Sequence, residues 1–276
     1  MAEPLSCLSF ELRGRRWLVG TQHYDLSIPL AFDRPQPNFF GVTPAREQHV
    51  VASTFTGDVR LGGSCNCSTY TLTPHCNGTH TECIGHLTAE RLSVRDLCTD
   101  ALSAALLISI RPTSASSTDE STQPQPQPGD LVLTRAAIDA AVSAAAFEDY
   151  RALVIRTLPN DASKLTRDYQ REAAPYFTSQ AMSWIVQRGI EHLVVDLPSV
   201  DRAEDEGYLS AHRIFWNLAR SAVAPGAEAR RGATITELAY IDEQIPDGPY
   251  LLNLQIAPFA ADAAPSRPIL MPLRPA

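Results

Sequence analysis

Four side chains that commonly bind metal ions lie within eleven residues of this chain. The segment 76–86 reads CNGTHTECIGH and carries Cys76, His80, Glu82 and His86. Their numbers are all even, so in an extended chain the four side chains face the same way, whereas on a helix residues 80 and 82 would diverge by about 200°. The pattern therefore predicts an extended segment that presents a thiol, two imidazoles and a carboxylate on one face.

An extended chain alone does not bring the ends of this segment together. At a rise of about 3.3 Å per residue, His80 and Glu82 lie roughly 6.6 Å apart and can bind one ion, but Cys76 lies roughly 13 Å from His80. The chain must therefore bend between Cys76 and His80. We place the bend at Asn77 and Gly78, because both residue types tolerate positive φ and glycine lets the backbone approach an ion closely.

The chemistry of these side chains favours a metal site. Borderline-soft divalent ions accept thiolate, imidazole and carboxylate ligands together. The alternative is that Cys76 and Cys83 are buried thiols beside a structural histidine and a capped turn, which is what isolated Cys and His residues usually are. That alternative leaves the clustering of the four side chains unexplained.

The composition excludes some classes of partner. The chain has 276 residues and a net charge of -8, and its 23 Lys and Arg residues form no basic stripe, which argues against a nucleic-acid surface. No apolar run is long enough to cross a membrane, and Glu3 stands where a signal peptide carries positive charge. We expect a cytoplasmic protein whose partners are small molecules or other proteins, with its six cysteines as free thiols or metal ligands.

Apolar periodicity predicts a mixed α/β fold. Strands are expected within 8–20, 24–30, 50–55, 68–72, 101–110, 151–157, 190–197, 250–258 and 268–273. Helices or helical turns are expected at 88–97, 136–146, 178–188 and 210–220. The succession of strand, helix and strand over 151–197 is typical of a helix that crosses over a sheet. We expect one domain over 1–276.

Two segments read as loops. Residues 113–130 are rich in Ser, Thr, Gln and Pro and cannot bury much apolar surface, so they predict a flexible surface insert. Residues 32–46 hold three prolines and predict a long structured loop, a common place for binding residues. In that loop Phe39 and Phe40 either wall a pocket for an aromatic substrate or pin the loop to the core.

Two polar residues far along the chain are candidates for the same site. His212 falls in the first turn of the helix at 210–220, where the helix dipole favours a neutral imidazole, although the acidic residues 204–206 oppose this. Alone, such a histidine is more often a surface or core residue than a ligand. Glu237 stands in apolar company and needs a partner, which is either Arg213 or Arg231, or a metal.

Taken together, these residues resemble a known family. The run HCNGTHTE at 75–82 is similar to the His-x-Gly-Thr-His-x-Asp signature of the cyclase family of metal-dependent hydrolases, which includes bacterial kynurenine formamidases and isatin hydrolases. The segments YDLSIPL at 24–30, LVIRT at 153–157 and VDLPSVD at 195–201 look like further family landmarks. The resemblance implies a swivelling β/β/α fold, with a mixed sheet and packed helices in a single domain, and a homo-oligomer (a dimer or tetramer).

The resemblance also implies roles for individual residues. His86 falls on the family's catalytic histidine. One or two divalent ions, zinc or manganese, are implied at five ligands: Cys76, His80, Glu82, His212 and Glu237. Cys76 stands where the family has a histidine and Glu82 where it has an aspartate, and a thiolate favours zinc over manganese. By a shift of one residue, His75 is the alternative to Cys76 as first ligand.

The activity implied by the family is amide hydrolysis. Metal-activated water would attack the carbonyl, and His86 would protonate the departing amine of an aromatic formamide such as N-formylkynurenine. One rival is the same site acting on a cyclic amide or lactone. The other is a non-enzymatic binding protein in which four thiols build a closed zinc site: Cys65, Cys67, Cys76 and Cys83.

Overall fold

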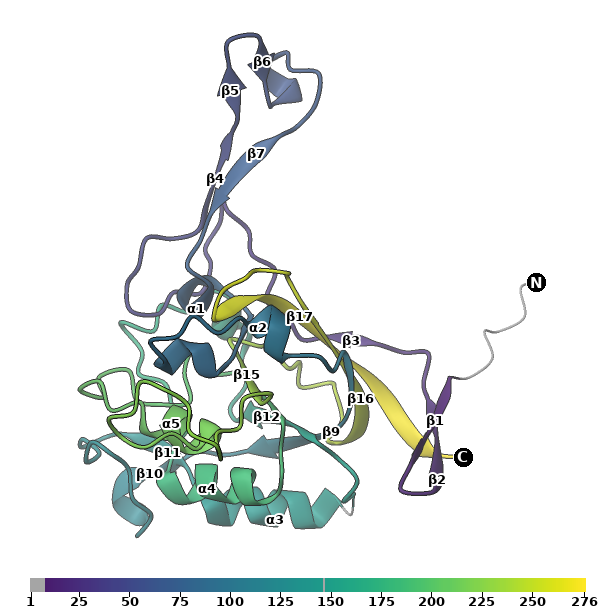
Figure 1. The fold of residues 1–276 in the computed structure, drawn as a ribbon, viewed down its shortest axis with the longest axis vertical. Helices are drawn as coiled ribbons and strands as arrows, with labels where there is room; N and C mark the ends of the chain where they lie inside the picture. Colours follow the sequence, from purple (N-terminus) through teal and green to yellow (C-terminus); the bar gives the residue numbers. More distant parts are fainter. Residues whose placement is uncertain (1–7, 146) are drawn as a thin grey trace.

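The computed structural model of the chain describes residues 8–145 and 147–276. Within these residues seven strands close into a ring in the order β17, β16, β9, β12, β14, β15 and β8, with β8 pairing back to β17 (Figure 1). The strands β9, β12, β14 and β15 run parallel, and the other pairs in the ring are antiparallel. The mixed α/β class predicted from the sequence is therefore confirmed, and ring closure is an additional finding.

The secondary structure has the following bounds. The strands are β1 (Ser9–Leu12), β2 (Arg15–Val19), β3 (Tyr24–Asp25), β4 (Arg46–His49), β5 (Val51–Ala52), β6 (Phe55–Thr56), β7 (Ser68–Thr71), β8 (His80–Glu82), β9 (Leu102–Ile110), β10 (Thr113–Ser114), β11 (Leu131–Leu133), β12 (Ala152–Thr157), β13 (Tyr176–Phe177), β14 (His192–Val195), β15 (Thr234–Glu237), β16 (Gly248–Ile256) and β17 (Ala263–Pro275). The helices are α1 (Pro74–Asn77), α2 (Val94–Leu97), α3 (Arg135–Ala145), α4 (Ser179–Gln187) and α5 (Ser210–Trp216). Short 3-10 helices are η1 (Val59–Leu61), η2 (Ile84–Leu87), η3 (Ala115–Ser117) and η4 (Ala162–Leu165).

The ring separates two apolar cores. One face of the strands packs on α3 and α4 through residues such as Ile108 and Leu153, which meet Ile138 and Ile185 of the helices. The other core lies inside the ring and is filled by strand residues such as Leu107, Val154, Leu252 and Leu270. Because both faces of β9, β12 and β14 are covered, these parallel strands are mostly continuous apolar runs rather than alternating ones.

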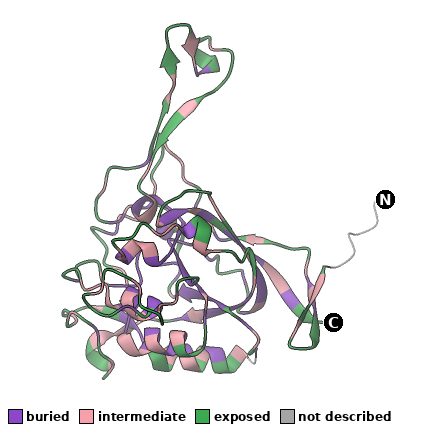
Figure 2. Ribbon diagram, in the orientation of Figure 1, coloured by how far each residue is buried: buried purple, intermediate pink, exposed green. Residues whose placement is uncertain are grey.

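A narrow arm projects from the body (Figure 1). The strands β4 and β7 pair as an antiparallel ribbon, with Arg46 opposite Thr71, and β5 pairs with β6 beyond them. The ribbon is largely exposed along its length (Figure 2). The strand expected over 50–55 is therefore two short strands of this arm rather than part of the main sheet. Neither short strand contributes to the apolar cores, because both lie on the arm outside the body.

Several expected elements are present with altered bounds. The N-terminal hairpin, the strand at 101–110 and the helix at 178–188 are confirmed. The helix at 136–146 is confirmed as far as Ala145, and residue 146 lies outside the described residues. The helix expected over 210–220 ends at Trp216, because Asn217 takes a left-handed conformation with φ of 54° and its N–H bonds the carbonyls of Arg213 and Ile214. The strand expected over 24–30 is reduced to β3 and a single bridge at Ser27.

The segment 113–130 is attached to the body through a carboxylate. Glu120 accepts hydrogen bonds from the N–H groups of Arg135 and Ala136 at the start of α3, at 2.8 and 3.2 Å. It also accepts a bond from the hydroxyl of Thr178, the N-cap of α4. The segment thus completes the start of α3, since helix N-termini leave unsatisfied N–H groups. Its flexibility stays a prediction.

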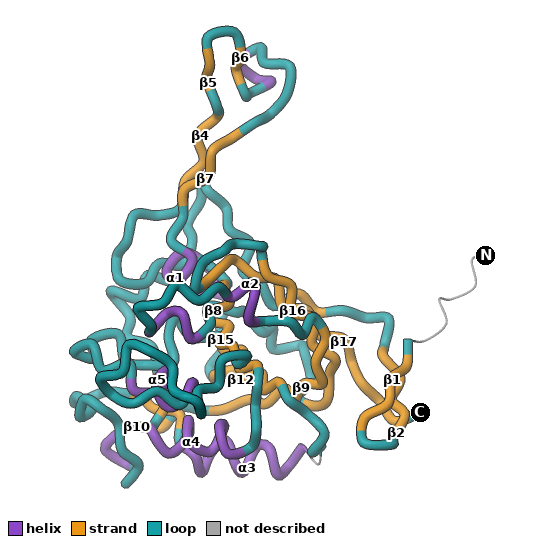
Figure 3. The backbone as a smooth tube through the Cα atoms, viewed as in Figure 1, coloured by secondary structure: helices purple, strands orange, loops and turns teal. Residues whose placement is uncertain are grey.

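Loops make up much of the face that carries α5, α2 and the site described next (Figure 3). None of the helices in the described part of the chain has both the length and the apolar character needed to cross a membrane.

Candidate metal centre and active site

The site is set by the register between two short strands. β8 pairs antiparallel with β15, so that His80 lies opposite Glu237 and Glu82 lies opposite Ile235. On its other edge β8 pairs with β17, with Glu82 opposite Ala263. Hydrogen bonding on both edges fixes β8 between residues that are far away in sequence. His80 and Glu82 keep the same face of the strand, as their alternation predicts.

Four side chains converge at this point, and we call them the inner cluster: His80, Glu82, His212 and Glu237. Helix α5 supplies His212, whose Nε2 lies 3.0 Å from Oε1 of Glu82 and 3.6 Å from Oε1 of Glu237. The Nε2 atom of His80 lies 3.5 Å from Oε2 of Glu237. All four side chains are almost fully buried. The prediction that these four residues meet in space agrees with this geometry. The arginine partner considered for Glu237 is wrong, because that carboxylate contacts His80 and His212 and accepts a hydrogen bond from the N–H of Val200 at 2.8 Å.

The electrostatics of the inner cluster hold both carboxylates charged. Burial opposes the charge of Glu82, but the imidazoles of His86 and His212 hold the pKa of that carboxyl well below its usual value. Burial and the charge of Glu82 likewise oppose ionisation of Glu237, yet the nearby imidazoles of His212 and His80 keep its pKa lowered. In return, despite burial, Glu82 and Asp201 raise the pKa of His212. The two buried carboxylates are therefore negative charges that need a positive partner, which is either a protonated imidazole or a bound cation.

Neighbouring groups orient each of these side chains. The Nδ1 atom of His80 lies 3.0 Å from the Gly78 carbonyl, and Nδ1 of His212 lies 2.7 Å from Oδ2 of Asp201. The second contact is the carboxylate–histidine arrangement that orients metal-binding imidazoles, leaving Nε2 to face the ion. Asp201 belongs to the VDLPSVD segment, but its role was not identified from the sequence. Side chains in a loop do not alternate regularly, so the sequence could not show which way the carboxylate of Asp201 points.

The inner cluster fits a divalent cation. Within the described residues, His80 Nε2, His212 Nε2 and Oε1 of Glu82 are buried without a hydrogen-bond partner. Ligand atoms of His80, Glu82 and Glu237 all lie within 4.8 Å of one another. Buried polar atoms are rarely left unpartnered, and these belong to residue types that bind zinc and related ions. The unmet bonding capacity of these atoms is what a bound ion would satisfy.

A second group of side chains, the outer cluster, surrounds the other oxygen of Glu82 and consists of His75, His86 and Asp262. The Oε2 atom of Glu82 lies 3.1 Å from Nδ1 of His75 and 3.9 Å from Nδ1 of His86. Asp262 Oδ2 lies 2.9 Å from Nε2 of His75 and 3.4 Å from Nδ1 of His86. Although burial opposes it, contacts with Asp262 and Glu82 raise the pKa of His75 to about 10.

The structure does not bring Cys76 into either cluster. Cys76 lies in α1, so the extended conformation expected for the whole segment 76–86 is wrong at its start and holds for β8 only. Its side chain packs with Phe39, Tyr169 and Leu238, and burial together with the charge of Glu237 raises the pKa of the thiol to about 11. A turn of helix rotates adjacent residues apart, which places His75 rather than Cys76 beside Glu82.

The bend between Cys76 and His80 is present, but its cause differs from the prediction. Gly78 has φ of 179° and ψ of -175°, which is extended backbone rather than the positive φ expected for a turn dipeptide. The change of direction comes from the end of α1.

Phe39 contacts Cys76 and is buried, whereas Phe40 is exposed, so Phe39 pins its loop to the body.

The four-thiol zinc site considered from the sequence is overturned. Cys65 and Cys67 are exposed on the arm, while Cys76 packs beside Phe39 and Cys83 packs beside Val94 in a separate apolar cluster. Thiols in such different surroundings cannot share one tetrahedral ion.

Replacing Cys65 and Cys67 together by Ser should therefore leave metal binding and folding intact. Exposed positions away from packed regions tolerate substitution within about 0.5 kcal/mol, so we expect the free energy of unfolding to stay within that range. Urea denaturation and metal analysis of the double variant check this. If the double variant unfolded and lost its metal, that result would support the closed four-thiol zinc site instead.

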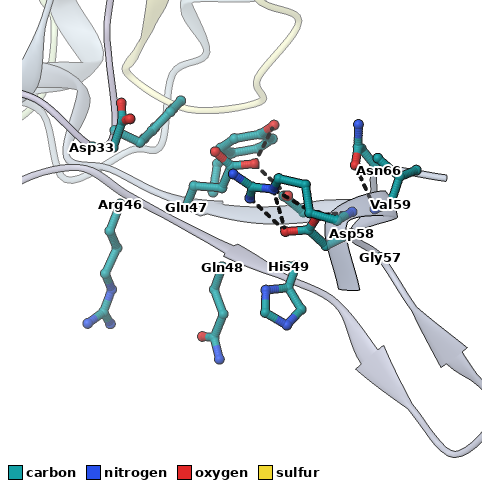
Figure 4. A pocket seen from close by; sticks show the side chains of 13 residues that line it. Asp33, Arg46, Glu47, Gln48, His49, Gly57, Asp58, Val59 and Asn66 are labelled. Carbon is teal, nitrogen blue, oxygen red and sulfur yellow. Dashed lines mark hydrogen bonds and ion pairs between the residues drawn. The ribbon is translucent and has the colours of Figure 1, made fainter. Parts of the chain in front are cut away.

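One of two cavities in the structure adjoins the candidate site. A cavity of about 440 Å³ is bounded by His75 and Asp262 of the outer cluster and by apolar side chains that include Leu72, Pro74 and Phe259. A larger cavity of about 850 Å³ lies along the arm among polar residues such as Arg46, Glu47, His49 and Asp58, and none of the predicted site residues lines it (Figure 4). The first cavity is the one that adjoins the chemistry.

Comparison with known proteins agrees with this geometry. Residues 24–202 match the sequence profile of the family described as "Putative cyclase". A 103-residue stretch is 28% identical to the kynurenine formamidase of Bacillus cereus, covering 37% of this chain and 42% of that enzyme. The chain therefore spans less than half the length of this curated relative.

Solved structures show the same fold at low sequence identity. Isatin hydrolase A from Labrenzia aggregata has a TM-score of 0.59 at 15% identity, covering 91% of this chain and 93% of that one. A predicted metal-dependent hydrolase from Bacillus stearothermophilus has a TM-score of 0.58 at 14% identity, covering 91% and 98%. The matched family profile covers well over half of the residues and includes both strand β8 and the loop that ends in Asp201, and on this basis the chain belongs to the cyclase family.

Proposed function

We propose that the protein is a metal-dependent amide hydrolase that acts on an aromatic formamide, N-formylkynurenine being the leading candidate. The observation that carries this proposal is the inner cluster, in which buried imidazole nitrogens and carboxylate oxygens face one another without partners. Membership of the cyclase family and the stretch shared with a kynurenine formamidase support the reaction class. Family kinship is weaker support for the substrate.

In this proposal the inner cluster holds the ion, zinc or manganese, and Cys76 is left out of the ligand set. A divalent ion at such a site lowers the pKa of water towards neutrality and stabilises negative charge on a carbonyl oxygen. His80, Glu82, His212 and Glu237 supply two imidazoles and two carboxylates, a set suited to either metal. Gly78 and Asp201 fix the tautomers of His80 and His212 by accepting from their Nδ1–H groups.

His86 is proposed to move the proton. Hydrolysis adds water across the C–N bond, giving formate and an amine, and the departing nitrogen must take up a proton. His86 is partly exposed and stands beside the inner cluster, with its ring centre 5.5 Å from that of His212. It is thus near enough to the cluster to reach a bound substrate, whereas the four proposed ligands are held by one another.

The adjoining cavity favours an aromatic substrate. Its volume of about 440 Å³ lies within the usual range for small-molecule sites. Tyr70, Leu72, Pro74 and Phe259 give it apolar walls, and His75 and Asp262 give it a polar end next to His86. An arylformamide would place its ring among the apolar walls and its amide at the polar end. The homo-oligomeric state and the cytoplasmic location implied above remain predictions, which sedimentation analysis and cell fractionation would test.

Replacing His86 by Gln should lower kcat/KM for N-formylkynurenine by about 10²–10⁴-fold, because general acid–base catalysis contributes that much. Metal content should stay at the wild-type level, since His86 is outside the proposed ligand set. Turnover of N-formylkynurenine and metal analysis on the same preparations check this.

A panel of formamides, cyclic amides and lactones assayed with the wild-type protein separates the substrate candidates. Turnover of a cyclic amide alone would replace the formamide by the ring-opening alternative. Wild-type protein that contains metal but hydrolyses nothing in the panel would contradict the proposed function.

A further inference from the structure

The outer cluster contains two residues to which the catalytic scheme above gives no role, His75 and Asp262. They connect the two groups that the scheme does use. His75 lies between two carboxylates, with Nδ1 at 3.1 Å from Glu82 and Nε2 at 2.9 Å from Asp262. The same Asp262 oxygen lies 3.4 Å from Nδ1 of His86. The contacts therefore run without interruption from a proposed metal ligand to the proposed proton donor.

The backbone fixes Asp262 at this place. Asp262 immediately precedes β17, whose register sets Ala263 opposite Glu82. Its carbonyl accepts a hydrogen bond from the N–H of Cys83, at 3.0 Å. Gly85 leaves the room that the approach needs, because a Cβ atom there would lie 3.3 Å from the Cβ of Asp262 and 2.2 Å from the Leu92 carbonyl oxygen. The carboxylate is thus held by sheet pairing rather than by a chance surface contact.

His75 is held just as firmly. It lies in α1, which begins at Pro74, a residue whose fixed φ suits the first turn of a helix. Its ring stacks on that of His86 with centroids 4.3 Å apart and planes inclined by 33°. Because both ring nitrogens of His75 face carboxylate oxygens, the ring has a single orientation that satisfies both contacts.

In this arrangement the two oxygens of Glu82 face different partners, and the two ring nitrogens of His86 have different roles. Oε1 of Glu82 faces His212 in the inner cluster, while Oε2 faces His75. A contact from His75 to Oε2 fixes the plane of the carboxylate and keeps Oε1 directed inwards. An acceptor at Nδ1 of His86 places the proton on that nitrogen in the neutral ring. Nε2 then carries the lone pair that takes a proton from the attacking water and passes it to the departing nitrogen.

We propose that Asp262 and His75 are positioning residues: Asp262 fixes the orientation and tautomer of His86, and His75 transmits the same constraint to Glu82. The proposal rests on the function proposed above, because it concerns the proton donor of that reaction. Asp262 lies outside the matched residues 24–202, and His75 entered above only as an alternative to Cys76; they come from the loop before β17 and from α1. The pair acts through other side chains and does not itself contact the reacting atoms.

The first test combines kinetics with metal analysis on the metal-loaded protein. Asp262→Asn keeps the size of the side chain but replaces one acceptor oxygen by a donor, and we expect kcat for N-formylkynurenine to fall by about 10- to 100-fold with KM within about twofold. Metal content should be unchanged. Asp96→Asn, on an exposed surface, is the matched control and should behave as wild type. In a His86→Gln background, Asp262→Asn should add less than about a twofold effect.

Two results of that test would overturn the proposal. One is an equal loss of kcat from Asp262→Asn with and without His86, because Asp262 would then act independently of that ring. The other is a second equivalent of zinc in the wild-type protein that disappears in His75→Ala, because the outer cluster would then be a cation site in its own right.

A spectroscopic test needs no substrate and therefore separates failure of this proposal from failure of the proposed function. In zinc-loaded protein, long-range ¹H–¹⁵N correlation spectra distinguish the two neutral tautomers of each histidine. We expect His86 as the Nδ1–H tautomer in the wild type and as a mixture in Asp262→Asn. An Nε2–H tautomer in the wild type, or a pattern unchanged in the variant, would overturn the proposal even in a protein that hydrolyses formamides.

Discussion

Replacing His80 by Ala is expected to remove the metal and with it the activity. The Nε2 atom of His80 is fully buried and faces Oε2 of Glu237 at 3.5 Å, at the centre of the inner cluster. A catalytic ion supplies several kcal/mol of transition-state stabilisation, so its loss should lower kcat/KM by about a thousandfold or more. Metal content after dialysis and turnover of N-formylkynurenine are the measurements.

His23→Ala is the control for this variant, because His23 is exposed and outside both clusters. It should retain metal and activity. A His80→Ala protein that stays folded, as judged by circular dichroism, and still contains stoichiometric metal would remove His80 from the ligand set. Full activity in such a protein would contradict the inner cluster as the reaction centre.

The second large effect is expected on stability, at a buried ion pair away from the metal ligands. The Nζ atom of Lys164 donates to Oδ2 of Asp196 at 2.7 Å and to the carbonyl and hydroxyl oxygens of Thr157. The lysine is 4% and the aspartate 1% exposed, and burial raises the pKa of Asp196. Lys164→Met leaves that carboxylate buried without its cation, so the free energy of unfolding should fall by about 3–5 kcal/mol.

Urea denaturation at neutral pH measures this loss, and three comparisons define it. Arg95→Met removes an exposed pair with Asp96 and should cost less than about 1 kcal/mol. Asp196→Asn added to Lys164→Met should restore part of the stability, because the amide carries no charge. The deficit of Lys164→Met should shrink as the pH is lowered, since protonation neutralises the buried carboxylate in the folded state. A loss below about 1 kcal/mol at neutral pH would show that water reaches Asp196.

Local patterns predicted many elements of the fold correctly. Helix α4 begins after Thr178, whose hydroxyl accepts from the N–H of Ala181, and the chain turns at Gly189 with φ of 72°. Apolar runs predicted β9, β12 and β14, because strands covered on both faces need apolar residues at every position. These elements were predictable because the interactions that define them lie within a few residues.

The arm and the closed ring were not predictable in the same way. The residues of β4 and β5 alternate little, and their pairing partners lie up to 25 residues away in sequence. Ring closure depends on β8, a strand of three residues, pairing with both β15 and β17. Such short strands carry almost no periodicity of their own, so only their neighbours define them.

The sequence by itself determined that His80 and Glu82, two residues apart, share one face, and the resemblance to the family predicted that His86, His212 and Glu237 join them. Tertiary structure alone placed His75 rather than Cys76 beside Glu82 and brought in Asp201 and Asp262. The physical reason is that a helical turn at residues 74–77 rotates neighbouring side chains in different directions, and that strand register joins residues more than 180 positions apart. Neither effect can be predicted from the spacing of residues along the chain.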